Sequence, residues 1–366
     1  MIPGLADFAL PFLRTLDPER AHELTLKALE SGLYPRQAFA DDARLAQSIW
    51  GLEFPNPIGI AAGFDKDARV PTEILSSGFG FAEIGTVTPR PQPGNPRPRI
   101  FRLLADRGMI NRLGFNSAGH AAVLGRLERI QKRRHKGVIG VNIGTNKDSS
   151  DRDADYVLGL ETFLPIAGYL TVNISSPNTP GLRDFHTEEE LDRLLGKLMA
   201  KRNALAQEGV ASPPITVKLS PDIADEDVAP ICDRLAAHSV DGIIVSNTTL
   251  DRSGLKSREY VDETGGLSGA PLYERSTRLL AKVYVHTRGE IPLIGVGGIT
   301  SGTTALGKIE AGASLIQLYT GLVYEGPGVI GRIKTALVAG IEQAGVDSIE
   351  GVIGSKAGEW AERNLN

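Results

Sequence analysis

Polar residues that could perform chemistry follow an apolar run in the stretch VNISSPNTPGLR, residues 172–183. Asn173 and Asn178 carry amides that both donate and accept hydrogen bonds, and Ser175 and Ser176 carry hydroxyls. Serine is a poor base at neutral pH, so a catalytic serine here would need help from a neighbouring group. The cluster is either a polar turn or the working end of an active site.

Eight short runs rich in Val, Ile and Leu repeat from about residue 55, each followed by a polar or Gly-rich turn and usually by an amphipathic segment. The runs are PIGIAAG from Pro57, FAEIGTVT from Phe81, GVIGVNIG from Gly137, YLTVNIS from Tyr169, ITVKLS from Ile215, DGIIVSNTT from Asp241, IPLIGVGG from Ile291 and ASLIQLYTG from Ala313. Apolar strands separated by helices indicate a parallel sheet covered on both faces, and eight such units predict an α/β fold, the (β/α)8 or TIM barrel. A doubly wound open sheet is the alternative, but GIAAGFDK does not match its glycine fingerprint.

Catalytic groups of such barrels lie where the strands end at the C-terminal face. Reading only those ends gives a concentrated set of polar residues and glycines: Lys66, Thr86, Asn142, Asn173, Lys218, Ser246, Asn247, Gly297, Gly298, Tyr319 and Thr320. Buried Lys and Asn are costly unless they are partnered, which favours a ligand site over chance. The spacings between the second and third runs and between the sixth and seventh are long, so each has room for an excursion over the barrel mouth.

The last two units, GVGGIT and LYTG, are typical of a phosphate site in a barrel. Glycines let backbone amides approach an anion, and a helix start adds donors. Without a dinucleotide fingerprint, a mononucleotide is favoured over NAD or FAD. Lys218 could then stabilise negative charge on a reduced flavin ring, although it could instead bind a substrate carboxylate or form a Schiff base. Asn142 and Asn173 match the alternating donors and acceptors of an isoalloxazine or pyrimidine edge.

The composition excludes several function classes. The chain has 366 residues, of which 41% are hydrophobic and 23% charged, and its net charge is −4, so nothing points to nucleic acid. The one cysteine, Cys232, cannot form a disulfide framework or a zinc site, and its place on an apolar helix face predicts core packing. We expect no bound metal. No apolar window of about 18 residues exists to span a membrane.

The N-terminal region predicts two amphipathic helices. Apolar residues recur every three or four positions in the set Leu5, Phe8, Ala9, Phe12, Leu13 and Leu16. Asp17 and Pro18 then read as an N-cap and a first helical residue, and Gly32 lies near the end of the second helix. This pair either covers the bottom of the barrel or lies in a membrane interface.

The motifs FDKD, NRLGFNS, GVNIGTNK, VNISSPNTPGLR, TVKLSPD, SNTT, GGLSG, GVGGI and LYTG occur in this order from about Ile58 to Tyr324. Together they resemble the dihydroorotate dehydrogenase family. Two features make the chain similar to the membrane-associated, quinone-dependent class 2 of that family. One is serine rather than cysteine in the NISSPNT loop, and the other is the apolar N-terminal extension.

The resemblance implies FMN as the cofactor and oxidation of (S)-dihydroorotate to orotate, in pyrimidine (UMP) biosynthesis. Ser176 would be the base at C5 while hydride passes from C6 to flavin N5; Ser175 is the competing candidate, and the family motif favours the serine immediately before the proline. Substrate binding would fall to Lys66, Asn111, Arg112, Leu113, Gly114, Phe115, Asn173, Asn178, Asn247 and Thr248. FMN would be held by Ala62, Gly63, Lys66, Thr86, Asn142, Asn173, Lys218, Ser246, Gly269, Gly298, Tyr319 and Thr320. A water relay through Thr179 and a lid from Asn178 to His186 are further hypotheses.

The class also implies a second electron acceptor, ubiquinone or menaquinone. His22 and Arg102 match positions associated with quinone, and Tyr319 could line the route. We expect residues 1–45 to form the membrane and quinone-tunnel segment and residues 46–366 to form the FMN-binding catalytic domain. The chain would be a peripheral protein on the cytoplasmic side of a bacterial inner membrane, bound to lipid through its N-terminal helices and without an obligatory protein subunit.

Two rival functions remain. A soluble dihydroorotate dehydrogenase linked to fumarate or NAD resembles this chain in the barrel but usually has cysteine where Ser176 stands. A non-catalytic flavin-binding, membrane-associated protein would be expected to have lost residues such as Ser176 and Lys66.

Overall fold

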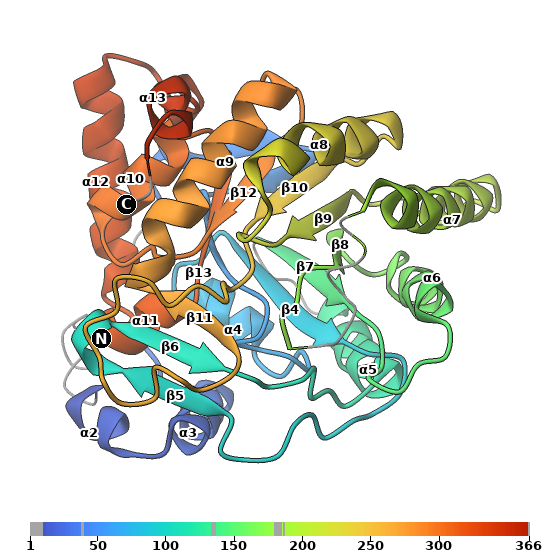
Figure 1. Ribbon diagram of the computed structural model, residues 1–366, viewed down its shortest axis with the longest axis horizontal. Helices are drawn as coiled ribbons and strands as arrows, with labels where there is room; N and C mark the ends of the chain where they lie inside the picture. Colours follow the sequence, from blue (N-terminus) through green and yellow to red (C-terminus); the bar gives the residue numbers. More distant parts are fainter. Residues whose placement is uncertain (1–9, 38–39, 133–136, 179–184, 186, 365–366) are drawn as a thin grey trace.

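The computed structural model describes residues 10–37, 40–132, 137–178, 185 and 187–364, and its centre is a closed parallel barrel (Figure 1). The barrel strands, in their order around the closed sheet, are β3 (Ile58–Ile60), β4 (Phe81–Val87), β7 (Val138–Ile143), β8 (Tyr169–Asn173), β9 (Ile215–Leu219), β10 (Gly242–Val245), β12 (Leu293–Val296) and β13 (Leu315–Leu318). These strands lie within the eight predicted apolar runs, and every neighbouring pair is parallel. The predicted (β/α)8 barrel is therefore confirmed.

Aromatic side chains fill the lower part of the barrel. A Cβ at Gly59 would lie 2.3 Å from the Phe81 ring, and one at Gly140 would lie 2.2 Å from the Tyr169 ring. These two glycines therefore leave the space that the rings occupy. The hairpin of β1 (Gln47–Ile49) and β2 (Leu52–Phe54) packs against the same cluster through Trp50, whose ring centroid lies 6.0 Å from that of Tyr169. A β-hairpin, rather than the N-terminal helices, thus covers this end of the barrel.

Helices surround the barrel. They are α4 (Pro71–Ser76), α5 (His120–Gln131), α6 (Arg152–Phe163), α7 (Glu188–Gln207), α8 (Val228–Ala237), α9 (Tyr273–Thr287), α10 (Gly302–Glu310), α11 (Thr320–Glu325), α12 (Val329–Ala344) and α13 (Ala357–Ala361), with 3-10 turns at Ala43–Leu45, Leu104–Asp106, Asp225–Asp227, Ala270–Leu272 and Ile349–Val352. Cys232 is buried on α8, which confirms its predicted place in the core.

The two long excursions meet in a second sheet over the mouth of the barrel. Strands β5 (Ile100–Leu103) and β6 (Gly108–Asn111) come from the first excursion, and β11 (Gly266–Gly269) comes from the second. They pair antiparallel in the order β11-β6-β5, and Figure 1 shows them at the lower left, between the barrel strands and helices α2 and α3. The predicted excursions are therefore present, and together they form one wall of the pocket described below.

Helices α2 (Leu10–Thr15) and α3 (Pro18–Glu30) lie beside this second sheet (Figure 1). Asp17 caps α3 as predicted, because its carboxylate accepts a hydrogen bond from the Arg20 amide at 2.9 Å. Arg69 holds α3 to the barrel through ion pairs with Glu23 and Glu30, both at 2.7 Å. The predicted helix residues Leu5, Phe8 and Ala9 lie outside the described residues.

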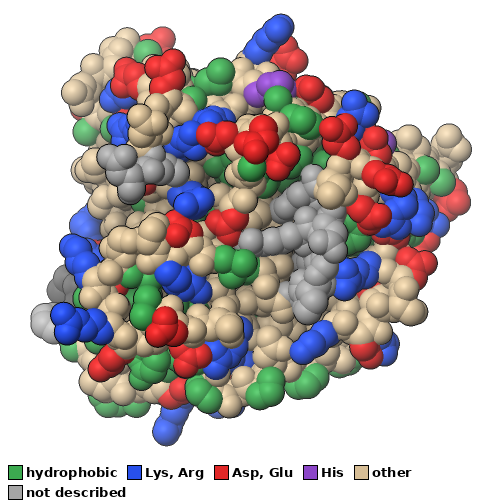
Figure 2. Space-filling view, viewed as in Figure 1, with side chains coloured by type: hydrophobic (Ala, Val, Ile, Leu, Met, Phe, Trp, Pro, Cys, Tyr) green, Lys and Arg blue, Asp and Glu red, His purple; other side chains and the backbone are tan. Residues whose placement is uncertain are grey.

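The N-terminal helices expose large apolar side chains to solvent. Phe12 is 64% exposed, Leu24 40%, and Leu33, just beyond α3, 73%. In Figure 2, hydrophobic side chains lie among charged ones along the lower edge of the molecule, the edge at which Figure 1 places α2 and α3. No helix within the described ranges is long and apolar enough to cross a membrane.

Candidate active site

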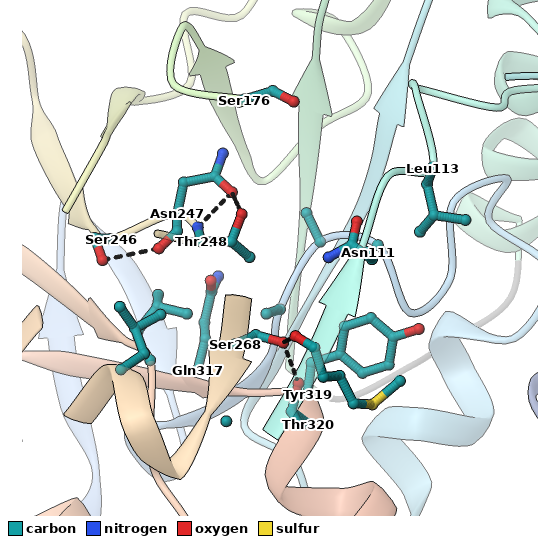
Figure 3. A pocket seen from close by; sticks show the side chains of 18 of the residues that line it. Asn111, Leu113, Ser176, Ser246, Asn247, Thr248, Ser268, Gln317, Tyr319 and Thr320 are labelled. Carbon is teal, nitrogen blue, oxygen red and sulfur yellow. Dashed lines mark hydrogen bonds between the residues drawn. The ribbon is translucent and has the colours of Figure 1, made fainter. Parts of the chain in front are cut away.

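One pocket collects most of the predicted site residues at the carboxyl ends of the barrel strands (Figure 3). Its lining includes Ala62, Gly63, Lys66, Thr86, Asn111, Leu113, Gly114, Phe115, Asn173, Ser176, Asn178, Lys218, Ser246, Asn247, Thr248, Gly269, Gly298, Tyr319 and Thr320. These residues come from seven barrel strands or the loops after them, and from the β5-β6-β11 sheet. Parallel strands of a closed barrel bring their carboxyl ends to one face, which is why such distant residues meet.

The two neighbouring serines after β8 have different surroundings. Ser175 is fully buried; its hydroxyl lies 3.3 Å from Oδ1 of Asn173 and accepts a hydrogen bond from Nδ2 of Asn247 at 3.1 Å. Ser176 lines the pocket, and its Oγ accepts a hydrogen bond from the backbone amide of Asn178 at 3.3 Å. Only Ser176 of this pair therefore presents its hydroxyl to a molecule in the pocket.

Side-chain amides surround Ser176. Asn247 donates from Nδ2 to Oδ1 of Asn173 at 3.2 Å, and Asn178 donates from Nδ2 to Oδ1 of Asn111 at 3.4 Å. In Figure 3, Asn247 and Asn111 lie on opposite sides of the space below Ser176. Amides on both sides of one space can hydrogen-bond the edges of a small planar ring that carries both donors and acceptors.

The far end of the pocket has the glycine turn that an anion requires. Gly298 has φ +75°, and a Cβ there would lie 2.4 Å from Cα of Tyr273, so only glycine fits. Thr320 begins α11, and its hydroxyl lies 2.9 Å from that of Ser268. A glycine turn, the start of a helix and hydroxyls together fit the phosphate of a mononucleotide.

Two lysines give the pocket a positive charge. Lys218 of β9 is buried and makes no hydrogen bond or ion pair with the described residues. Burial lowers the pKa of Lys218, and the charge of Glu83 partly opposes this effect. Lys66 donates to Oδ1 of Asn116 at 2.5 Å, and loss of solvation, followed by the charge of Arg99, lowers its pKa to about 7. A buried cation without a protein anion in contact fits a ring that gains negative charge on reduction, as expected for FMN.

Two of the residues predicted to bind substrate or FMN do not line the pocket. Arg112 follows β6 with its side chain turned away: Nη1 forms an ion pair with Glu263, and the guanidinium lies 4.6 Å from the centroid of the Phe101 ring. Asn142 is fully buried beneath the pocket, where its Oδ1 accepts a hydrogen bond from the Thr86 hydroxyl at 2.6 Å. Asn142 can therefore act on a ligand only through residues such as Thr86.

Some residues near the pocket were missed by the sequence prediction. Gln317 lines the pocket from the middle of β13. Its Nε2 donates a hydrogen bond at 2.7 Å to Oε2 of Glu83, which lies in the middle of β4. Both are polar residues inside apolar runs, in FAEIG and LIQLYTG, which is the signal that would have found them. The prediction considered only the ends of the strands and therefore passed over both.

A second, apolar cavity of about 400 Å³ lies between the N-terminal helices and the barrel. It contains His22 and Arg102, and it shares Ile100, Met109 and Tyr319 with the polar pocket. Burial, followed by the charge of Lys66, lowers the pKa of His22 to about 4, so this imidazole is neutral near neutral pH. Arg102 donates to backbone carbonyls, including that of Leu16 at 2.6 Å.

Several sequence hypotheses fall outside the described residues. Thr179 and His186 are among them, and only Asn178 and Phe185 of the predicted lid, residues 178–186, are described. Within the part of the chain that the structure describes, no group of three or more His, Cys, Asp or Glu side chains is arranged to hold a metal ion.

Comparisons with known proteins agree in one family. The family model described as dihydroorotate dehydrogenase matches residues 44–341. The chain is 51% identical over 365 residues to a protein of Rhizobium rhizogenes named dihydroorotate dehydrogenase (quinone), with 100% of both chains covered. It is 52% identical over 353 residues to a protein of the same name from Brucella ovis, with 96% of each chain covered. Its fold is similar to the crystal structure of DHODH from Eimeria tenella in complex with ferulenol, with a TM-score of 0.89, 40% identity and coverage of 93% of this chain and 96% of that one.

Proposed function

The chain belongs to the dihydroorotate dehydrogenase family, and from this premise we propose how its pocket carries out the reaction. It is an FMN-dependent enzyme that oxidises (S)-dihydroorotate to orotate in pyrimidine biosynthesis, with a quinone as electron acceptor. The observation that carries the mechanism is the direct contact between two unlike cavities. A polar pocket containing Ser176 and an apolar cavity containing His22 share the side chain of Tyr319.

FMN, when bound, supplies the acceptor for the hydride that leaves C6 of dihydroorotate. We assign its phosphate to the glycine turn at Gly298 and to Thr320, because these offer backbone amides and a hydroxyl at the end of the pocket. Lys218 would lie against the ring and stabilise the negative charge that it gains. Further contacts would come from Ala62, Gly63, Lys66, Thr86, Asn173, Ser246, Gly269 and Tyr319, with Asn142 acting from beneath.

We assign the substrate to the space between the asparagines. Asn111, Asn173, Asn178 and Asn247 would hydrogen-bond the amide edges and the carboxylate of dihydroorotate, with Thr248 beside them. Lys66 would add a positive charge next to the carboxylate. The segment 113–115 would close one side through Leu113, Gly114 and Phe115, whereas Arg112 would act only by holding that segment in place through Glu263.

We assign the proton transfer to Ser176. Its Oγ would take the proton from C5 and pass its own proton to a water molecule, while hydride leaves C6, so that the C5–C6 bond becomes a double bond. The backbone amide of Asn178, which donates to the same Oγ, would stabilise negative charge as the hydroxyl loses its own proton. Ser175 is already engaged by Asn247 and faces away from the pocket, which supports the choice of Ser176.

The apolar cavity is the proposed quinone site. A quinone ring there would contact Tyr319 from the side opposite to the polar pocket, close to His22 and Arg102. The lining is mostly aliphatic, which suits a lipid-soluble acceptor and excludes water from the route. Because its pKa lies near 4, His22 would interact with a quinone oxygen as a neutral donor rather than as a cation.

The N-terminal helices are the proposed link to the membrane. We propose that residues 1–45 form a membrane and quinone-tunnel segment and that residues 46–366 form the catalytic domain. Exposed Phe12, Leu24 and Leu33 support contact with lipid, and Leu24 and Leu33 also line the cavity that would receive the quinone. On this proposal the enzyme is a peripheral protein on the cytoplasmic side of a bacterial inner membrane and needs no second protein subunit.

A comparison of electron acceptors tests this function. The purified enzyme should oxidise dihydroorotate with a short-chain ubiquinone analogue and should turn over slowly or not at all with fumarate or NAD. Turnover with fumarate alone would contradict the quinone site. The serine at position 176, where the soluble classes usually carry cysteine, favours the first result.

A further inference from the structure

Glu83 is a carboxylate in the interior of the barrel that the proposed reaction does not use. It lies in the middle of β4 and is fully buried. Its Oε1 accepts a hydrogen bond from Nδ2 of Asn142 at 2.8 Å. Its Oε2 accepts from the Tyr169 hydroxyl at 2.9 Å and from Nε2 of Gln317 at 2.7 Å. Burial of a carboxylate costs desolvation free energy. A carboxylate that three donors hold in the barrel interior is therefore expected to have a function.

The bond from Asn142 to Glu83 fixes which way the Asn142 amide points. With Nδ2 on Glu83, its Oδ1 accepts from the Thr86 hydroxyl at 2.6 Å and from Nδ2 of Asn173 at 3.2 Å. Thr86 and Asn173 both line the pocket. A change at Glu83 would therefore reach the pocket through the orientation of a single amide.

The second amide held by Glu83 is that of Gln317, which lines the pocket itself. With Nε2 on Glu83, its Oε1 is left as a buried acceptor that has no partner among the described residues. Tyr169 completes the arrangement: burial, followed by the charge of Glu83, raises the pKa of its hydroxyl well above the usual value, so the hydroxyl stays a donor. Glu83 therefore leaves the Gln317 oxygen as an acceptor without a described partner at the wall of the pocket.

The charge of Glu83 also acts on Lys218, which lines the pocket. It raises the pKa of the Lys218 ammonium and so opposes the effect of burial.

We propose that Glu83 is a positioning residue for the flavin: it holds the Asn142 and Gln317 amides with their oxygens in place. The proposal rests on the proposed function, because it takes the ligand of the pocket to be FMN. It adds to that function a residue that touches neither substrate nor cofactor and acts through two amides.

Glu83→Gln tests the proposal because it keeps the shape and removes the charge. A single amide oxygen cannot accept from all three donors, and the new amino group must face an amino group of Asn142 or Gln317, so one amide turns over. We expect the Kd for FMN, measured by fluorescence titration of apoprotein, to rise roughly ten- to a hundredfold. We also expect the flavin midpoint potential to depend on pH differently from that of the wild type, because loss of the Glu83 charge lowers the pKa of Lys218 further.

Two further variants separate this role from general damage to the barrel. Tyr169→Phe removes one donor but leaves the charge, so it should raise the Kd for FMN less than E83Q does and keep the wild-type pH slope. Thr216→Val removes the Thr171–Thr216 hydrogen bond of 2.9 Å in the same barrel interior and should change neither quantity. If Tyr169→Phe and Thr216→Val bind FMN with the same Kd, the positioning role is overturned, even if E83Q does not fold.

A wild-type Kd for FMN in folded E83Q would overturn the positioning role. Failure of the proposed function would look different, because wild-type protein would then bind no FMN or would not be reduced by dihydroorotate.

Discussion

The imidazole of His22 and the phenol ring of Tyr319 lie 6.1 Å apart between ring centroids, and both line the apolar cavity. Tyr319 also lines the polar pocket, so a helix at the start of the chain meets the active site through one aromatic contact. Phe64 completes this group, with its ring edge-on to both partners at 5.3 Å and 5.6 Å. The polar pocket and the apolar cavity therefore share one wall, and the proposed sites of the two half-reactions would lie on either side of it.

Substitution of Ser176 should stop the first half-reaction without loss of FMN. In Ser176→Ala no hydroxyl remains to take the C5 proton, so kcat should fall by about 10²- to 10⁴-fold at neutral pH. Stopped-flow measurement of flavin bleaching by dihydroorotate, with FMN content from absorbance, checks this. Ser175→Ala is the matched control and should retain kcat within about tenfold, since its loss affects only hydrogen bonds of typical strength. Equal losses in the two variants would contradict the assignment.

The charge of Lys66 should make substrate binding depend on pH. The pKa of Lys66 is lowered to about 7, so the free enzyme carries the ammonium below that pH and loses it above. Because the ammonium attracts the substrate carboxylate, KM for dihydroorotate should rise as the pH increases from about 6 to 9. Lys66→Met should have a high KM at all these pH values. A wild-type KM that stays flat would contradict a role for the Lys66 charge.

His22 should matter only for the second half-reaction. With a pKa near 4, the imidazole stays neutral across the working pH range, so KM for a ubiquinone analogue should not depend on its titration. His22→Phe fills the space but removes the donor, and it should raise KM for the quinone roughly tenfold while bleaching by dihydroorotate keeps its rate. Slower bleaching in this variant would place His22 in the first half-reaction instead.

The exposed apolar side chains of the N-terminal segment should bind lipid. The double variant with Phe12→Ser and Leu33→Ser removes two large apolar groups, so partitioning onto phospholipid vesicles should weaken at least about tenfold. Co-sedimentation with vesicles measures this, and turnover with a water-soluble dye is the control that should not change. Leu158→Ser serves as the matched surface variant, because Leu158 is 46% exposed and lies on helix α6, outside the N-terminal segment. Equal loss with Leu158→Ser would contradict the membrane role.

Much of the fold could be predicted because each barrel strand is buried on both faces. The eight apolar runs follow directly from that burial, and the Asp17–Pro18 helix start follows from local capping chemistry. The β5-β6-β11 sheet could not be predicted, since its strands are short and Met109 and Ser268, which pair across it, are 159 residues apart. Nothing local in either excursion specifies that pairing.

The site shows a similar division. Strand ends identified part of the pocket lining, because every barrel strand ends on the same face, and the family resemblance added others such as Ser176 and Asn178. Arg112 was expected in the pocket with its neighbours, but side chains of successive residues in extended chain alternate, and Asn111 takes the inward position. Glu83 and Gln317 were overlooked because the interior of their strands was read as apolar. Which of the strand positions face the barrel interior depends on the three-dimensional stagger of the strands.

The most direct test of the account is an anaerobic absorbance spectrum of the purified enzyme before and after addition of dihydroorotate. We expect a yellow flavin absorbance band that bleaches with dihydroorotate and returns when a ubiquinone analogue is added. A band that stays oxidised with dihydroorotate present would contradict the assignment of substrate to the asparagine-lined space. Protein that binds no flavin even after reconstitution with FMN would contradict the phosphate site at Gly298 and Thr320.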